Sequence, residues 1–289
     1  RADVATISRR HGLAIEEAGR RARYSFLGRV AQQAGAHYVA VGHNAYDQAE
    51  TVLMHWIRGS GLAGLRGMLP RTRLADYRLL DEPAPSSREL WLVRPLLGVT
   101  RSEIELYCDR HGLQPRFDRS NLDTTYFRNW LRHRVIPLVE QHNPNFREVI
   151  RRTALVIADD HALLRSLLEE AWPEIVREES VPEGGAAAGS GGRIVFGLAA
   201  WRALPISLQR SSIREAIHRL RRSLRNINFI HVENAVQVGR QGPTGAESTL
   251  PRGLVLTVGY QRLMVAEASA DLPLPDWPTR ATVVSGSIS

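Results

Sequence analysis

Cysteine is almost absent from this sequence, which has a single one, Cys108, among 289 residues. One thiol excludes a disulfide framework and a zinc site built from several cysteines, and it fits a reducing cytoplasm, where we expect the protein. The ten histidines are scattered without the spacing of metal ligands, so we expect no metal site. No window approaches the roughly 18 consecutive apolar residues of a membrane helix, and no apolar stretch follows the first charges. We therefore expect neither a membrane span nor a secretory signal.

Lysine is absent altogether. All 38 basic residues are arginines, and they outnumber 30 acidic residues, which gives a formal net charge of +8 and an isoelectric point of about 10.4. A GC-rich genome explains arginine in place of lysine, but it does not explain the net excess of positive charge. Because arginine keeps its charge and binds phosphate through paired hydrogen bonds, the excess indicates a polyanionic partner such as nucleic acid.

Helices and short strands alternate in the first half of the chain. Helical spacing of apolar residues covers 15–35, and a short buried strand follows at 37–43. A second helix is expected from Asp47 to about Arg58, with Gly59 as its C-terminal cap. A helix between two strands favours an α/β layer with parallel pairing.

The same alternation continues along the chain. A strand is expected within 88–98, and a helix begins after Thr100, where Glu103 completes a capping box. Further helices are expected over 129–143 and 145–179, the second long enough to bridge two domains.

The second half reads as a small α+β module. We expect a helix over about 207–222, another around 231–239, and two strands joined by a turn at Gly259 and Tyr260. The expected organisation is an α/β domain at 1–150, a connecting helix at 151–180, a flexible Gly/Ala-rich loop at 181–192, the small domain at 193–270 and a tail at 271–289.

The strand and helix at 37–58 place three polar residues together. His43 closes the strand, and Asp47 and Glu50 lie on one face of the first helical turn. One interpretation is a capping box in which Asp47 accepts a backbone N–H and Glu50 reaches back. The other is an active-site wall at the carboxyl edge of the sheet, presenting negative charge to an ammonium group or a metal, with His43 as a polar or proton-transfer neighbour. Spacing alone leaves both open.

A second polar group occupies residues 117–137. Arginines and asparagines with helical spacing suit a solvated helix face, and together with aromatic residues they also suit phosphate binding and base stacking. The residues are Asp118, Asn121, Asp123, Tyr126, Phe127, Arg128, Asn129, Trp130, Arg132 and Arg134.

Three long motifs occur in the order GHNAYDQAETVLMHWIRGSGLAGLRGM, VRPLLGVTRSEIELYC and DRSNLDTTYFRNWLRHRVIPLV. Together they resemble the tRNA(Ile)-lysidine synthases, N-type ATP pyrophosphatases of the PP-loop superfamily. The segment EEAGRRARYSFL is similar to a Glu-x-x-x-Arg-x-x-Arg-Tyr pattern of that family through Glu16, Arg20, Arg23 and Tyr24. LPISLQRSSIREAI, HVENAVQV and LPRGLVLTVGYQRLMV resemble its small substrate-recognition domain, so the resemblance covers about residues 12–266.

The resemblance implies a Rossmann-like parallel sheet, incomplete at its N-terminus, and a small α+β domain that recognises tRNA. It implies a ligase that uses ATP and Mg2+ to adenylate the C2 carbonyl of cytidine 34 in the CAU anticodon of tRNA(Ile). The amine of L-lysine then displaces AMP to give lysidine. Arginines and metal would neutralise the phosphates, and carboxylates would hold the positive charge of lysine. The resemblance leaves homodimerisation open.

The resemblance also assigns roles to residues. It places the lysine and nucleotide site around Arg23, His43, Asp47, Glu50, Asn121 and Arg132, with Arg20, Arg23 and His43 nearest the nucleotide. It assigns contacts with phosphate or tRNA to Arg58, Arg94, Arg101, Arg128, Asn129 and Arg134. For the arginines, a structural ion pair is the alternative.

Two departures from the family pattern stand out. Tyr46 occupies the place of the first Asp in the usual His-x-x-Asp-Asp-Gln, and the family's Ser-Gly-Gly-x-Asp-Ser loop is absent from the sequence. We therefore expect an N-terminally truncated piece that binds ATP weakly and does not make lysidine by itself. The alternatives are a non-catalytic RNA-binding protein without the ATP loop, and another tRNA-modifying PP-loop enzyme, which the single cysteine disfavours.

Overall fold

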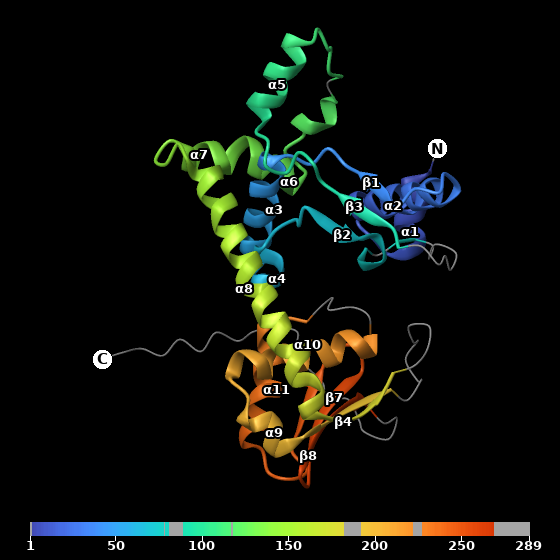
Figure 1. The fold of residues 1–289 in the computed structure, drawn as a ribbon, viewed down its shortest axis with the longest axis vertical. Coiled ribbons are helices and arrows are strands. Elements are labelled where there is room, and N and C mark those ends of the chain that lie inside the picture. Colours follow the sequence, from blue (N-terminus) through green and yellow to red (C-terminus); the bar gives the residue numbers. More distant parts are fainter. Residues whose placement is uncertain are drawn as a thin grey trace. The chain divides into compact units, whose positions relative to one another are not determined.

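A computed structural model of the chain describes residues 2–77, 79–80, 89–116, 118–181, 192–221 and 227–268. The chain divides into two compact units, Arg1–Ala162 and Leu163–Ser289 (Figure 1). The division falls within the segment 151–180 expected to be a connecting helix, of which residues 151–175 belong to one long helix, α8. Most of the expected flexible loop at 181–192 and the expected tail at 271–289 lie outside the described residues.

The first unit combines helices with a small sheet. Its elements are α1 (Val4–His11), α2 (Ile15–Gln33), β1 (Tyr38–Ala40), α3 (Ala45–Ile57), α4 (Leu62–Leu65), β2 (Arg71–Arg73), η1 (Leu74–Asp76), β3 (Trp91–Val93), α5 (Arg101–Arg110), η2 (Arg119–Leu122), α6 (Phe127–Trp130), a π-helical turn η3 (Leu131–Val135), α7 (Ile136–Glu140) and the start of α8 (Phe146–Ile175).

Strands β1 and β3 pair in parallel, and β2 pairs antiparallel with the other side of β3. Val39 and Leu92 are buried on the face that packs against Tyr24 and Ala31 of α2, with Leu74 beside them. The expected parallel pairing is therefore present, with a helix packed on one face.

The strand expected at 37–43 is shorter in the structure, because pairing with β3 covers three residues and one further backbone bond, from Val41 to Val93. His43 consequently lies in the loop beyond the strand and does not close it. Strand β2 has no counterpart among the expected elements, since three residues are too few to show a period.

A second core of the first unit surrounds α3. Leu53 of α3 packs with Leu131 and Ile136, which are both fully buried, and Phe146 and Ile150 of α8 lie against them. This core fixes the segment from α6 to α7 against α3, and that packing positions the polar groups described below.

The second unit is built on a five-stranded antiparallel sheet in the order β4-β5-β8-β7-β6 (Figure 1). Its elements besides the end of α8 are β4 (Val176–Ser180), β5 (Arg193–Gly197), α9 (Leu198–Ala203), α10 (Ile206–Arg221), α11 (Phe229–Gln241), β6 (Glu247–Leu250), β7 (Leu254–Gly259) and β8 (Arg262–Glu267). Its core joins fully buried residues of the sheet and helices, including Phe196, Trp201, Ile213, Val236 and Leu263.

The expected helices at 207–222 and 231–239 and the hairpin at Gly259 are present in this unit. The helix expected to run to residue 179 ends earlier, at Ile175, and β4 begins at Val176. Pro173 weakens the last turn, and pairing with β5 satisfies the backbone that follows. None of the helices in the described ranges is long and apolar enough to cross a membrane.

Candidate active site

The N-terminus of α3 is closed by Asn44. Its Oδ1 accepts hydrogen bonds from the backbone N–H of Tyr46 (2.9 Å) and Asp47 (3.1 Å), and the Asn44 N–H donates to Asp47 Oδ2 (3.0 Å). This is a capping box with Asp47 as its third residue. The capping interpretation that paired Asp47 with Glu50 is therefore wrong by three positions, because the helix begins at Ala45. Glu50 is left without a capping role.

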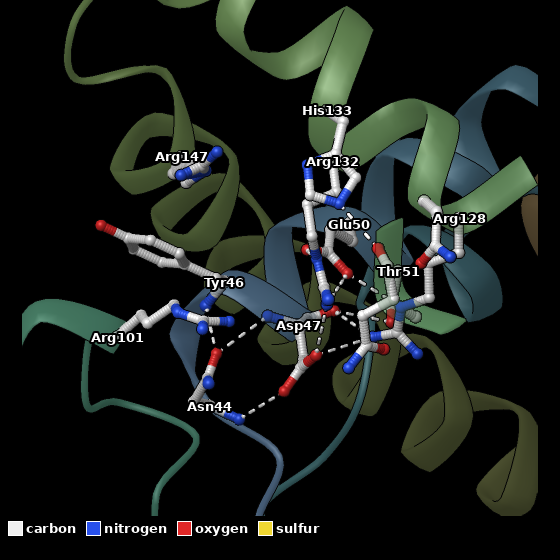
Figure 2. Close-up of polar contacts among 12 residues, drawn as sticks. Asn44, Tyr46, Asp47, Glu50, Thr51, Arg101, Arg128, Arg132, His133 and Arg147 are labelled. Atoms are coloured by element: carbon white, nitrogen blue, oxygen red, sulfur yellow. Dashed lines mark hydrogen bonds and ion pairs between the residues drawn. The ribbon is translucent and has the colours of Figure 1, made fainter. Parts of the chain in front are cut away.

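Glu50 instead belongs to a group that we call the carboxylate–arginine cluster, formed by Asp47, Glu50, Arg128 and Arg132 (Figure 2). Arg132 donates from Nε to Glu50 Oε1 (2.6 Å) and from Nη2 to Oε2 (2.8 Å), and Arg128 Nε donates to Oε2 (2.9 Å). Nη2 of each arginine also lies near Asp47 Oδ1, at 3.2 and 3.3 Å. The cluster thus holds two formal charges of each sign.

Burial differs within the cluster. The Glu50 side chain is 2% exposed and that of Asp47 18%, whereas Arg128 and Arg132 are 27% and 23% exposed. The hydrogen bonds that Arg132 donates to Glu50 raise the pKa of Arg132. An unpaired buried carboxylate is costly, and the two arginines supply the partners that Glu50 needs inside the fold. Asp47 is the carboxylate of the pair that solvent reaches.

His43 lies beside the cluster. Its Nδ1 is buried without a hydrogen-bond partner among the described residues. Burial lowers the pKa of His43, the charge of Asp47 opposes this, and the charges of Arg94, Arg128 and Arg23 add to the lowering. The ring is therefore neutral near pH 7, and a neutral imidazole has one nitrogen free to accept a proton.

Arg94, expected at a phosphate or tRNA, is 4% exposed. Nη1 donates to the carbonyl of Leu69 (2.5 Å) and to Thr72 Oγ1 (3.2 Å), and Nη2 donates to the Tyr77 hydroxyl. This placement corrects the expectation, because a guanidinium that ties β3 to the β2 segment from inside is not presented to an RNA. Its role is structural, but its partners in the described residues are a carbonyl and two hydroxyl groups and not the carboxylate of an ion pair.

Arg20 and Arg23 lie on α2. Arg20 pairs with Glu17 (2.8 Å) and lies near the rings of Tyr24 and Tyr77, at 6.0 and 5.7 Å. Arg23 is exposed, and its charge reaches His43. Of the residues that the resemblance places near the nucleotide, Arg23 and His43 are therefore linked electrostatically.

The remaining expected residues lie outside the cluster. The Asn129 amide donates to the carbonyls of Ser120 and Asp123, both at 2.9 Å, and His133 Nε2 is 2.7 Å from the Asn121 carbonyl, so these residues hold the η2 loop against α6 and η3. Arg101 pairs with Glu105 on the surface, Arg58 lies over the Phe127 ring, and Arg134 is exposed.

Two contacts had no signal in the sequence. The Tyr46 ring lies under the guanidinium of Arg147 (4.3 Å), a residue of α8 a hundred positions away (Figure 2). Gln48 is 3% exposed and holds the segment after α4. Its Oε1 accepts a hydrogen bond from the Met68 N–H (2.8 Å), and its Nε2 donates one to the Met68 carbonyl (3.1 Å). Both fix the surroundings of α3 from distant positions.

The described ranges contain no group of three or more His, Cys, Asp or Glu side chains placed to hold a metal ion. Nothing in this site therefore assigns Mg2+ to particular residues. The site consists of fixed charges, a neutral imidazole and a closed helix N-terminus.

Comparison with known families gives the fold a name. The family model of the PP-loop domain matches residues 1–139, which carry the whole carboxylate–arginine cluster. Residues 1–139 are therefore similar to the PP-loop domain. The α/β fold class predicted from the sequence is thereby confirmed, with the antiparallel α+β unit following it.

Curated relatives extend the similarity beyond the PP-loop domain. The chain is 38% identical over 262 residues to a tRNA(Ile)-lysidine synthase of Geobacter sulfurreducens, covering 90% of this chain and 50% of that protein. The tRNA(Ile)-lysidine synthase of Dehalococcoides mccartyi is 35% identical, and the match covers 88% of this chain and 50% of that protein. The one of Geobacillus kaustophilus is 31% identical, and the match covers 91% of this chain and 52% of that protein. The resemblance inferred from the motifs is confirmed, and the chain spans about half the length of these relatives.

Among solved structures, the U34-tRNA thiolase NcsA from Methanococcus maripaludis with its [4Fe-4S] cluster matches at 20% identity and a TM-score of 0.34. The match covers 48% of this chain and 42% of that one, and it is too remote to bear on function.

Proposed function

We propose that the chain is the lysine-binding and nucleotide-binding part of a tRNA(Ile)-lysidine synthase. In this reaction the C2 carbonyl oxygen of cytidine 34 in a CAU anticodon attacks the α-phosphorus of ATP, and pyrophosphate leaves. The amine of L-lysine then attacks C2, the bond from C2 to the oxygen of AMP breaks, and the amine loses a proton. Lysidine, AMP and pyrophosphate are the products.

One observation carries this proposal: the carboxylate–arginine cluster next to the N-terminus of α3, near the carboxyl ends of parallel strands β1 and β3. Free lysine carries two ammonium groups and one carboxylate. A site with fixed guanidinium and carboxylate groups side by side matches that mixture of charges, whereas RNA binding alone has no use for carboxylates.

The geometry suggests a division of labour between the two carboxylates. Asp47 is the better exposed and is the candidate to face an ammonium group, while buried Glu50 orients Arg128 and Arg132. In this arrangement the arginines face the carboxylate of lysine. His43 is neutral, and the charge of Asp47 acts on its pKa. His43 is therefore the candidate to accept the proton that the amine loses.

Use of ATP is proposed from the PP-loop domain, and the nucleotide is assigned to the side of the site where Arg23 and His43 lie. Several further points stay predictions. They are the use of Mg2+, tRNA(Ile) and L-lysine, the domain limits, homodimerisation, and the lack of activity of these 289 residues alone. Each is open to measurement on the purified protein.

The test uses the protein expressed from its complete gene, with Glu50→Gln and Asp47→Asn. Both substitutions are expected to weaken lysine binding far more than ATP binding, by about tenfold or more. Asp47→Asn removes the charge that holds an ammonium group, which contributes about 1.5 to 3 kcal/mol, and Glu50→Gln removes the charge that orients the two arginines facing the lysine carboxylate. Lysine-dependent release of AMP and lysine incorporation into tRNA with a CAU anticodon provide the readout.

Glu215→Gln is the matched control, because Glu215 also pairs with two arginines, Arg165 and Arg219, but in the second unit. It is expected to leave lysine binding unchanged. Equal effects of Glu50→Gln on lysine and ATP would reduce Glu50 to a structural role, and RNA binding without any lysine-dependent step would favour a non-catalytic RNA-binding protein.

A further inference from the structure

A stacked pair of aromatic rings lies on α6, on the segment that also supplies the arginines of the cluster. The rings of Phe127 and Trp130 are 5.7 Å apart and inclined by only 18°, and the guanidinium of Arg58 lies 5.5 Å from the centre of the Phe127 ring. We call these three residues the α6 stack. Phe127 also packs against the core around Leu53, so one end of the stack is anchored.

The outer end of the stack is open. Trp130 is 41% exposed, and within the described residues its indole N–H donates no hydrogen bond. An exposed tryptophan face costs free energy in water, and it is a surface on which a planar group of a ligand can stack. Stability of the fold gives no reason for this exposure, because Trp130 is not part of the core cluster that its neighbours Phe127 and Leu131 join.

The charges around the stack favour RNA over protein. Arg58 and Arg134 are both exposed, and neither pairs with a carboxylate in the part of the chain that the structure describes. Arg101 and Arg152, two other exposed arginines of the first unit's helices, each have a glutamate within 4 Å. Unpaired guanidinium groups beside an exposed ring are what phosphates and unstacked bases require.

The distance from the cluster limits which base is bound. Trp130 stands in the sequence between Arg128 and Arg132, two residues from each, so the stack and the cluster share one short segment. Successive stacked nucleotides of a strand lie about 3.4 Å apart. A loop whose target base enters the cluster would therefore bring a neighbouring base to the stack.

We propose that the α6 stack binds an unpaired base of the anticodon loop that flanks the modified cytidine, with Trp130 as the stacking surface and Arg58 and Arg134 on the flanking phosphates. This inference rests on the proposed function. It makes Trp130 a positioning residue, because it holds the loop while the cluster acts on the target base.

The test measures binding of a 17-nucleotide anticodon stem-loop with a CAU loop, carrying 2-aminopurine in place of adenosine 35. Trp130→Ala is expected to weaken binding about five- to one-hundred-fold, the range found when a stacking aromatic is removed. The fluorescence of the bound 2-aminopurine should rise, since an unstacked base is no longer quenched. Trp130→Phe should restore most of the affinity.

Trp56→Ala is the control, because Trp56 is 67% exposed on α3 and has no stacked ring or arginine among the described residues. It should leave both affinity and fluorescence unchanged. Arg58→Ala should reduce the slope of log K against log salt concentration by about one, whereas Trp130→Ala should leave that slope unaltered. Thermal unfolding of all variants checks that the fold persists.

Unchanged affinity and fluorescence in Trp130→Ala would overturn the proposal, as would an equal loss in Trp56→Ala. A change of oligomeric state in Trp130→Ala without loss of RNA affinity would also overturn it, in favour of a second copy of the chain as the occupant. If Trp130→Ala loses RNA while Asp47→Asn keeps normal lysine binding, the stack stands and the proposed function fails; the reverse result rejects the stack alone.

Discussion

Glu50 is a buried carboxylate that two arginines enclose. Three guanidinium nitrogens donate to it, one from Arg128 and two from Arg132, and both arginines are partly exposed while Glu50 is almost fully enclosed. The pair is therefore asymmetric: the arginines have water as an alternative partner and Glu50 has none. Loss of either arginine harms Glu50 more than loss of Glu50 harms the arginines.

Removal of the Glu50 carboxylate should destabilise the protein. Glu50→Ala is expected to lower the free energy of unfolding by about 2 to 4 kcal/mol, at the low end for a broken buried ion pair because both arginines keep some water. Glu105→Ala, which removes an exposed partner of Arg101, should cost less than about 1 kcal/mol. Urea unfolding of the two variants measures the difference; equal losses would contradict the buried role.

His43 should make stability depend on pH. Burial lowers the pKa of His43 below its value of 6.5 in the unfolded chain, so the unfolded state binds the proton more readily. The contribution of His43 is thus fully present above pH 6.5 and is lost as the pH falls below it. His43→Gln should flatten the loss of stability between about pH 7 and 5, as measured by chemical unfolding; an unaltered pH profile would argue against a neutral buried ring.

Helix α3 is the element on which the site depends. Asn44 caps it, Asp47 closes the capping box and continues into the cluster, Gln48 holds the following turn, and Leu53 enters the core. One helix therefore connects the local cap with three distant segments. Displacement of its first turn would move the reachable carboxylate away from both arginines.

Asn44→Ala tests this connection. It should cost about 1 kcal/mol of stability, as the loss of an N-cap usually does, and it should also weaken lysine binding, because the N–H groups of Tyr46 and Asp47 lose their acceptor and the first turn is no longer held. Thr100→Ala removes the corresponding cap of α5, where Glu103 completes the box. It should cost similar stability with no effect on lysine, so calorimetric titration with lysine separates a positioning role from a general loss of stability.

Local features of the fold were predictable, and distant contacts were not. The capping box at Thr100, the helix ending before Gly35 and the hairpin at Gly259 follow from neighbouring residues. Strand β4 was taken for helix because only pairing with β5 distinguishes it. The partners of Glu50 lie 78 and 82 positions away, so no spacing within α3 reveals them.

The composition of the whole chain gives it a positive surface in which every basic group is an arginine. Some of the arginines are bonded inside the fold, as Arg94 is and as those of the carboxylate–arginine cluster are. The formal excess of positive charge is nevertheless +8. Such a charge steers polyanions toward the protein and makes their affinity depend on salt.

Binding of tRNA should therefore fall steeply as salt rises. Each neutralised phosphate adds about 0.7 to 0.9 to the slope of log K against log salt concentration, so the loss between about 50 and 200 mM is large. Filter binding or fluorescence anisotropy at several salt concentrations measures the slope. Lysine binding should hardly change over the same range of salt concentration, because the cluster that binds lysine has no net charge. An affinity for tRNA that does not depend on salt would count against an RNA partner.

The π-helical turn η3 has a consequence for the length of its segment. Leu131 and Ile136 are five residues apart and both fully buried in one core, which the i to i+5 bonding of a π turn permits and a regular α-helix does not. The turn thus contains one residue more than a straight helix needs. Deleting a single residue there would regularise the helix and leave Leu131 and Ile136 four residues apart on one face, so shortening by one residue should preserve the core.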